Sequence, residues 1–388
     1  MAWTLSSHVR LANDRITDAD AYRQQATAAE ICRRLNDQPG LVLADEVGMG
    51  KTFVAFAVAV SVLHSTGRRR PVVVMIPPAV SEKWPRDWSV FEQRCLLGGP
   101  AIRATTRTVE RGSEFLKLLD DGADRQAHLI FLKHGALSRT LNDPFIRLAI
   151  VREAFRYQRR LTTQLAAFPR WAGRLLGDGR FTPNRTRTLL KSPPATWAHE
   201  WERLGMSALE DDPVPKAILR GLRPVDLGQL RKVLADVPLR RGAHIERRVG
   251  DLRDPLRDAV ETAWAGALRN LGERLPLLVL DEAHHTKNPN SLARLFDSPE
   301  ALRDADAVSG GGALANVFER MLFLTATPFQ LGHRELINVL GRFAGTKIGT
   351  AAKVGLRSNL DQLGVQLDTA QACLAPTQLA KSDSNAAT

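Results

Sequence analysis

LVLADEVGMGKTFVAFAVAVSVL, residues 41–63, is the stretch that decides the fold. It begins with three apolar residues, 41–43, which are typical of a buried parallel strand. A loop with two glycines follows, and Lys51 and Thr52 then open an apolar helix. A strand, a glycine loop and a helix in this order predict a phosphate-binding loop. Glycines let backbone N–H groups approach phosphate, and the helix N-terminus favours its negative charge.

Two side chains give this loop its expected chemistry. Lys51 is expected to reach the β- and γ-phosphates of a nucleotide, and the Thr52 hydroxyl to bind Mg²⁺. The strict G-x-x-x-x-G-K-[ST] pattern fails at its first position, where Asp45 stands. An ordinary glycine turn is therefore the alternative interpretation. The residues predicted to contact nucleotide are Asp45, Glu46, Val47, Gly48, Met49, Gly50, Lys51 and Thr52.

A second apolar run, LPLLVL at Leu275–Leu280, leads directly into Asp281 and Glu282. Open α/β sheets bind ligands outside the carboxyl ends of their strands, which is where this pair is expected. We expect Asp281 to hold Mg²⁺, usually through water, and Glu282 to take a proton from the water that attacks the γ-phosphate. The alternative is an acidic pair that only caps a strand.

The remaining apolar runs predict the rest of one sheet. Residues 71–76, 129–132 and 320–324 read as further buried strands, and residues 17–35 and 335–343 read as helices. Strands that alternate with helices predict an α/β fold with a mainly parallel sheet and helices on both faces.

Residues 141–270 break this alternation. The segment has no good strand, and its prolines separate several helical stretches, such as residues 145–162 and 229–234. It holds 24 Lys and Arg against 15 Asp and Glu, and four of the seven tryptophans. We expect those tryptophans to be core residues. The basic charge fits either a nucleic-acid surface or a solvated exterior, and the sequence leaves both open.

Composition narrows the class of protein. The net charge of +12 makes an anionic partner plausible, nucleic acid first, although an arginine-rich composition alone is the alternative. Cys32, Cys95 and Cys373 lie far apart and predict neither a disulfide framework nor a zinc site. The N-terminus lacks an apolar signal core, and the apolar-rich run at residues 53–63 is too short to span a bilayer. We therefore expect a cytoplasmic protein that makes no membrane contact.

Several motifs together resemble a known family. ADEVGMGKT (44–52), LDEAHHTKNP (280–289) and LTATPFQLGHREL (324–336) resemble motifs I, II and III of superfamily 2 helicases, in particular the Swi2/Snf2-like DNA-dependent ATPases. VVVMIPPAVSEKW resembles motif Ia, and LIFLKHGAL resembles the next strand–loop motif. In this family Asp45 is normal at the first loop position. QQATAA (24–29) resembles the upstream adenine-reading motif, which makes Gln25 the expected adenine contact.

The resemblance implies a RecA-like (P-loop NTPase) domain that binds ATP and Mg²⁺ and works on nucleic acid, with double-stranded DNA as the expected partner. Motif III implies that Thr325, Ala326 and Thr327 couple the nucleotide state to DNA contact. The residues expected to contact nucleic acid are Pro77, Trp84 and His134. For Trp84 the alternative is core packing, and for His134 it is an ordinary polar residue with its hydrogen bonds satisfied.

The same resemblance divides the chain. Residues 1–140 are expected to form the first part of the RecA-like domain with an N-terminal helix, and 141–270 an inserted basic helical subdomain. Residues 271–345 would form the second part of the RecA-like domain, and 346–388 the start of a linker and a polar tail. Since no glycine-arginine motif follows residue 345, we expect the family's second RecA-like domain on a separate chain, or lost by truncation.

We expect the chain to be the ATP-binding half of a DNA-dependent ATPase motor and to hydrolyse ATP only weakly on its own. One alternative is the motor fragment of a restriction or phage-defence system. Another is a nucleic-acid-binding module that holds ATP without turnover.

Overall fold

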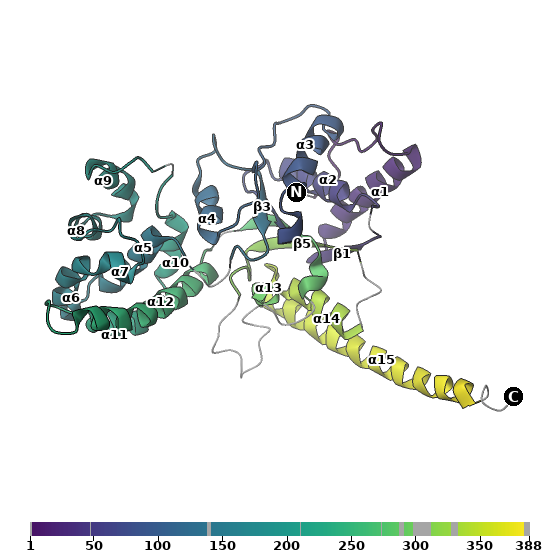
Figure 1. Ribbon diagram of the computed structural model, residues 1–388. Helices are drawn as coiled ribbons and strands as arrows, with labels where there is room; N and C mark the ends of the chain where they lie inside the picture. Colours follow the sequence, from purple (N-terminus) through teal and green to yellow (C-terminus); the bar gives the residue numbers. More distant parts are fainter. Residues whose placement is uncertain are drawn as a thin grey trace. The chain divides into compact units, whose positions relative to one another are not determined.

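The protein folds into two compact units (Figure 1), one built on a sheet and one purely helical. The computed structural model describes residues 2–46, 48–137, 141–209, 211–272, 274–286, 291–297, 312–326 and 333–383. The first unit comprises residues 1–108, 128–134 and 274–388, and the second comprises 109–127 and 135–273. The second unit therefore includes residues 109–127, which the sequence had assigned to the RecA-like domain.

A parallel sheet organises the first unit. Its strands run in the order β1-β5-β4-β2-β3, and every neighbouring pair is parallel. This confirms the predicted α/β class and is consistent with a RecA-like fold. The strands are β1 (Gly40–Ala44), β2 (Val72–Ile76), β3 (Leu129–Lys133), β4 (Leu275–Leu280) and β5 (Phe318–Thr325).

The register brings the functional loops to one edge. Ala44, the last residue of β1, pairs with Thr325, the last residue of β5. Leu280, the last residue of β4, pairs with Met75 near the end of β2. Because all these strands are parallel, the glycine loop after β1 and the carboxylates after β4 leave the sheet at the same edge, with β5 between them.

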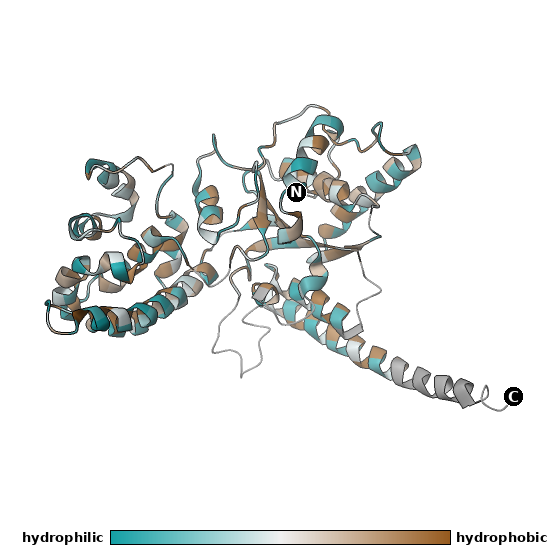
Figure 2. Cartoon of the chain, in the orientation of Figure 1, coloured by the Kyte–Doolittle hydropathy of each residue, from teal (hydrophilic) through white to brown (hydrophobic). Residues whose placement is uncertain are grey.

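Helices cover both faces of the sheet (Figure 1). Helices α1 (Asp18–Leu35), α2 (Lys51–Ser65) and α3 (Lys83–Cys95) lie on one face. Their core centres on Phe56, whose ring contacts those of Trp84, Trp88, Phe91 and Phe131. The strands are mostly hydrophobic, as Figure 2 shows, and β2 and β4 are buried at every residue, as expected of inner strands of a parallel sheet.

The opposite face carries α14 (His333–Gly341) and the short helix Arg342–Gly345. The ring of Phe323 on β5 packs there against Phe296 and Phe343. The sequence had placed one helix over residues 335–343, whereas the last turn is a separate, tighter helix. Both faces are thus filled, as the sequence predicts.

The second unit is an all-helical body with its own core. It consists of α4 (Gly112–Asp120), α5 (Pro144–Phe155), α6 (Thr162–Ala167), α7 (Ala172–Leu175), α8 (Pro183–Lys191), α9 (Trp197–Arg203), α10 (Lys216–Leu222), α11 (Gly228–Ala235) and α12 (Ile245–Arg269), with short 3₁₀ turns between them. Trp171, Trp197, Trp201 and Trp264 are all buried, which confirms that they are core residues. The helix predicted over residues 145–162 ends at Phe155, because Tyr157 adopts a left-handed conformation with φ of 60°.

One long helix follows the sheet unit's last short helix. Helix α15 (Thr350–Asp383) runs through the segment that the sequence assigned to a linker and polar tail. The content of alanine, leucine and glutamine in these residues favours a helix. Throughout the part of the chain that the structure describes, no helix combines the length and apolar character needed to cross a membrane.

Candidate nucleotide-binding site

The glycine loop joins β1 to α2 in a conformation that needs glycine. Gly48 and Gly50 have φ of 88° and 85°, a region that side chains rarely allow. The backbone N–H of Asp45 donates to the carbonyl of Thr325 at 3.3 Å, which ties the start of the loop to β5. The N–H groups at the start of α2 point out of the helix end and are available to an anion.

The Lys51 side chain folds back over the loop. Its Nζ donates to the carbonyl oxygens of Asp45 and Glu46, each at 2.7 Å. An ammonium group has three N–H donors, so one remains after these two bonds. The loop therefore fixes the lysine's charge beside the helix N-terminus with a donor left for a phosphate oxygen.

Two residues of helix α1 that the sequence did not predict as site residues form hydrogen bonds to the glycine loop. Arg23 donates to Asp45 Oδ2 at 3.1 Å and to the carbonyl of Met49 at 3.0 Å. The Gln24 amide donates to the same carbonyl at 3.4 Å, and a Cβ on Gly50 would lie 2.2 Å from Gln24 Nε2. No local sequence pattern pairs an arginine with a loop 22 positions further on.

The structure places Gln25 differently from its neighbour. Its Oε1 accepts from the backbone N–H of Leu11, and its Nε2 donates to the carbonyl of Val9, both at 3.1 Å. The Gln25 amide thus anchors the N-terminal segment, and Gln24 is the glutamine that touches the loop. The adenine contact of Gln25 stays a prediction.

Asp281 is a half-buried carboxylate held in place by hydrogen bonds. Its Oδ2 accepts from the indole N–H of Trp84 at 2.9 Å, and its Oδ1 from the backbone N–H of Glu282 at 2.9 Å. Burial raises the pKa of Asp281, and the charge of Glu282 raises it further, whereas the Trp84 hydrogen bond lowers it. Each oxygen keeps a lone pair, so the group can still bind a cation.

Glu282 adopts a conformation that is rare for its type, with φ of 49°. Such strained residues cluster at functional sites, because the surrounding structure must hold them there. The carboxylate oxygen Oε2 lies 3.1 Å from Nδ1 of His284, and the side chain is 36% exposed. The Glu282 side chain is thus partly exposed, while its Oε2 is buried beside the His284 ring and forms no hydrogen bond with a described residue.

These residues fit a magnesium nucleotide. The Thr52 hydroxyl and the Asp281 carboxylate are hard oxygen ligands, which Mg²⁺ prefers, usually one or two from protein with water and phosphate completing the set. Within the described ranges no group of three or more His, Cys, Asp or Glu is arranged around a common metal position.

The structure buries the three residues expected to contact nucleic acid. Pro77, Trp84 and His134 expose little surface, and their contact with a strand stays a prediction. The Trp84 ring packs edge-on to Phe56 at 5.2 Å, since a large aromatic ring gains more from the core than from solvent. Burial lowers the pKa of His134 to about 4, and its ring lies 6.2 Å from that of His285, beside the acidic loop.

The coupling residues are only partly described. Thr325 is buried at the end of β5, and Ala326 follows it, half-buried. Val47 of the glycine loop and Thr327 lie outside the described residues. The coupling role stays a prediction.

The Trp84–Asp281 hydrogen bond leads to a stability prediction. Trp84→Phe keeps an aromatic ring but removes the donor to the half-buried Asp281 carboxylate, which should lower the free energy of unfolding by about 1–3 kcal/mol at neutral pH. The loss should shrink on acidification. The Trp84 bond favours the ionised form of Asp281, so its contribution is present above the pKa of this carboxyl and disappears as the group is protonated. Denaturant unfolding at several pH values measures this, and a pH-independent loss would contradict it.

The sequence was also compared with known proteins. No family model matches this chain, and no curated protein gives a match.

Proposed function

We propose that this chain is the ATP-binding, RecA-like half of a nucleic-acid-dependent ATPase motor, which uses ATP hydrolysis to move on or remodel DNA. One observation carries the proposal: the Lys51 loop and the Asp281–Glu282 pair leave the same edge of one parallel sheet. Phosphate-binding loops and acidic pairs need this arrangement to share a nucleotide.

Each residue has a distinct role in the proposed reaction. Lys51 and the N-terminal N–H groups of α2 bind the phosphates, while Thr52 and Asp281 hold Mg²⁺. When bound, Mg²⁺ stabilises negative charge on the phosphate oxygens. Glu282 accepts the proton of the attacking water, and the His284 ring lies beside it, with Nδ1 3.1 Å from Glu282 Oε2.

The excess of positive charge on this chain suggests its binding partner. The chain carries +12, and residues 141–270 hold 24 basic against 15 acidic residues. Such an excess favours the phosphate backbone of nucleic acid, and we propose double-stranded DNA. Basal turnover should be low, because arginines contributed by a second lobe in motors of this type add about 10³–10⁵ in rate.

A DNA-stimulated ATPase assay tests this function. We expect MgATP to bind, and phosphate release to rise when duplex DNA is added. Absence of MgATP binding to the folded chain would contradict the proposal. Binding without any turnover, with DNA present, would instead support the nucleic-acid-binding module that only holds ATP.

A further inference from the structure

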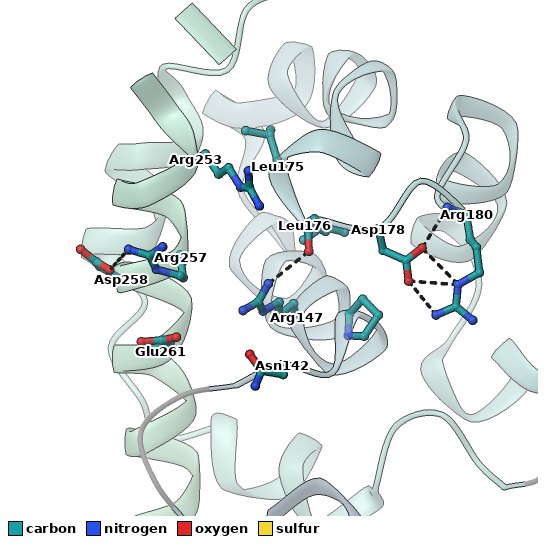
Figure 3. A pocket seen from close by; sticks show the side chains of 12 residues that line it. Asn142, Arg147, Leu175, Leu176, Asp178, Arg180, Arg253, Arg257, Asp258 and Glu261 are labelled. Carbon is teal, nitrogen blue, oxygen red and sulfur yellow. Dashed lines mark hydrogen bonds and ion pairs between the residues drawn. The ribbon is translucent and has the colours of Figure 1, made fainter. Parts of the chain in front are cut away.

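The second unit contains a charged cleft that the proposed ATP chemistry does not use. It has a volume of about 780 Å³ and lies between α5 and α12, beside the turn that follows α7. Figure 3 shows Arg147, Arg253 and Arg257 around this space, with Glu261 at one side. Arg147 comes from α5, and the other three residues lie on α12.

Arg147 brings a half-buried positive charge to the cleft. Its guanidinium donates to two backbone carbonyls, those of Leu141 at 2.6 Å and Leu176 at 3.1 Å. These acceptors are neutral and do not cancel the charge. Burial lowers the pKa of Arg147, and the positive charges of Arg257 and Arg253 lower it further, against the opposing effect of Glu261. An arginine stays protonated all the same, so a bound anion would relieve this repulsion.

Arg253 is free to bind an anion. It forms no hydrogen bond or ion pair with any residue for which the structure gives a position. A Cβ atom added to Gly177 would lie 3.5 Å from Arg253 Nη2 and 4.0 Å from Arg147 Nη1. Gly177 has φ of 75° and no side chain to fill this point. The two guanidinium groups therefore border one open space.

The acidic residues of the cleft are mostly occupied. Asp178 takes three hydrogen bonds from the Arg180 side chain, and Asp258 pairs with Arg257 at 3.5 Å. Arg257 also pairs with Asp254 at 2.9 Å, and the charges of Glu261 and Asp143 act on Arg147. Arg147 and Arg253 are thus the two arginines of the cleft that form no ion pair with a described residue, and both guanidinium groups can donate.

We propose that this cleft binds one phosphodiester group of a nucleic-acid backbone, gripped between Arg147 and Arg253. Two guanidinium groups that form no ion pair can donate to the oxygens of a phosphodiester, which carries one negative charge. The excess of basic residues across 141–270 favours the same ligand. The assignment rests on the proposed function only in naming nucleic acid as the partner.

Binding of the full chain to fluorescently labelled duplex DNA, measured at several salt concentrations, tests this site. Arg253→Gln should weaken binding about 5–10-fold and reduce the slope of log K against log salt by about 0.9, the value for one lost phosphate contact. Arg147→Lys keeps the charge but loses the planar fork, so it should weaken binding with a nearly unchanged slope. Arg247→Gln is the matched control: it removes one charge from the same helix, from a side chain that is 83% exposed.

Several results would overturn the proposal. One is an Arg253→Gln variant that binds DNA like the wild type, and another is an equal loss in Arg247→Gln, which would show a diffuse charge effect. A third result concerns inorganic phosphate, compared with chloride at equal ionic strength. If phosphate displaced DNA more strongly than chloride from the wild type but not from Arg253→Gln, the cleft would be a site for free phosphate. Failure of the ATPase proposal looks different: MgATP binding would be absent while Arg253→Gln still weakened DNA binding.

Discussion

Lys51→Ala is expected to lower the affinity for MgATP about 100-fold and to abolish measurable hydrolysis. Hydrogen bonds from a charged donor to phosphate contribute about 1.5–3 kcal/mol each, so losing the ammonium removes roughly 3 kcal/mol of binding free energy. The variant also loses the two bonds by which Nζ holds the carbonyls of Asp45 and Glu46, which loosens the loop. Titration with a fluorescent ATP analogue measures the effect.

The control for this variant is Lys232→Ala. Lys232 is an exposed lysine on α11 in the second unit, so its loss removes the same charge without touching the glycine loop. We expect its MgATP affinity to equal that of the wild type. If Lys51→Ala bound nucleotide as tightly as Lys232→Ala, while both showed the same thermal unfolding, the phosphate-binding role of the loop would be refuted.

Glu282→Gln should separate catalysis from binding. An amide cannot accept the proton of the attacking water, and general-base catalysis contributes about 10²–10⁴ in rate, so turnover should fall by at least about 100-fold. The amide is close in size to the carboxylate, so MgATP affinity should change by less than about threefold. DNA-stimulated phosphate release and ATP titration on the same preparation give both values.

Glu92→Gln provides the comparison for that variant, because Glu92 is an exposed residue of α3. It should keep both turnover and affinity. Should Glu282→Gln retain wild-type turnover, another group would have to accept the proton of the attacking water, and the general-base role proposed for Glu282 would be wrong.

The sheet was predictable because each of its strands is encoded by a few consecutive residues. Each strand is a short apolar run, and Leu275–Leu280 was placed with its observed bounds. The position of the two carboxylates directly after this strand was predictable for the same reason, and strand ends are where parallel sheets bind ligands. The glycine loop was predictable too, because all of its residues are consecutive in the sequence.

What the sequence did not reveal depends on long-range contacts. Trp84 donates to Asp281, 197 positions away, so no local pattern distinguishes this tryptophan from a surface residue. Gln24 and Gln25 are adjacent on α1, and only the direction of each side chain shows which one touches the loop. The charge excess of residues 141–270 was evident, but which arginine lacks an acidic partner depends on the packing of α5 against α12.

A double-mutant cycle between Lys51→Ala and Asp281→Asn tests the central claim most directly, that both residues serve one Mg²⁺–nucleotide pocket. MgATP affinity is measured for the wild type, both single variants and the double variant. Groups that act on one ligand are coupled, so the losses should be non-additive by at least about 1 kcal/mol. Losses that add to within about 0.3 kcal/mol would mean that the two residues act independently, and would contradict the shared pocket.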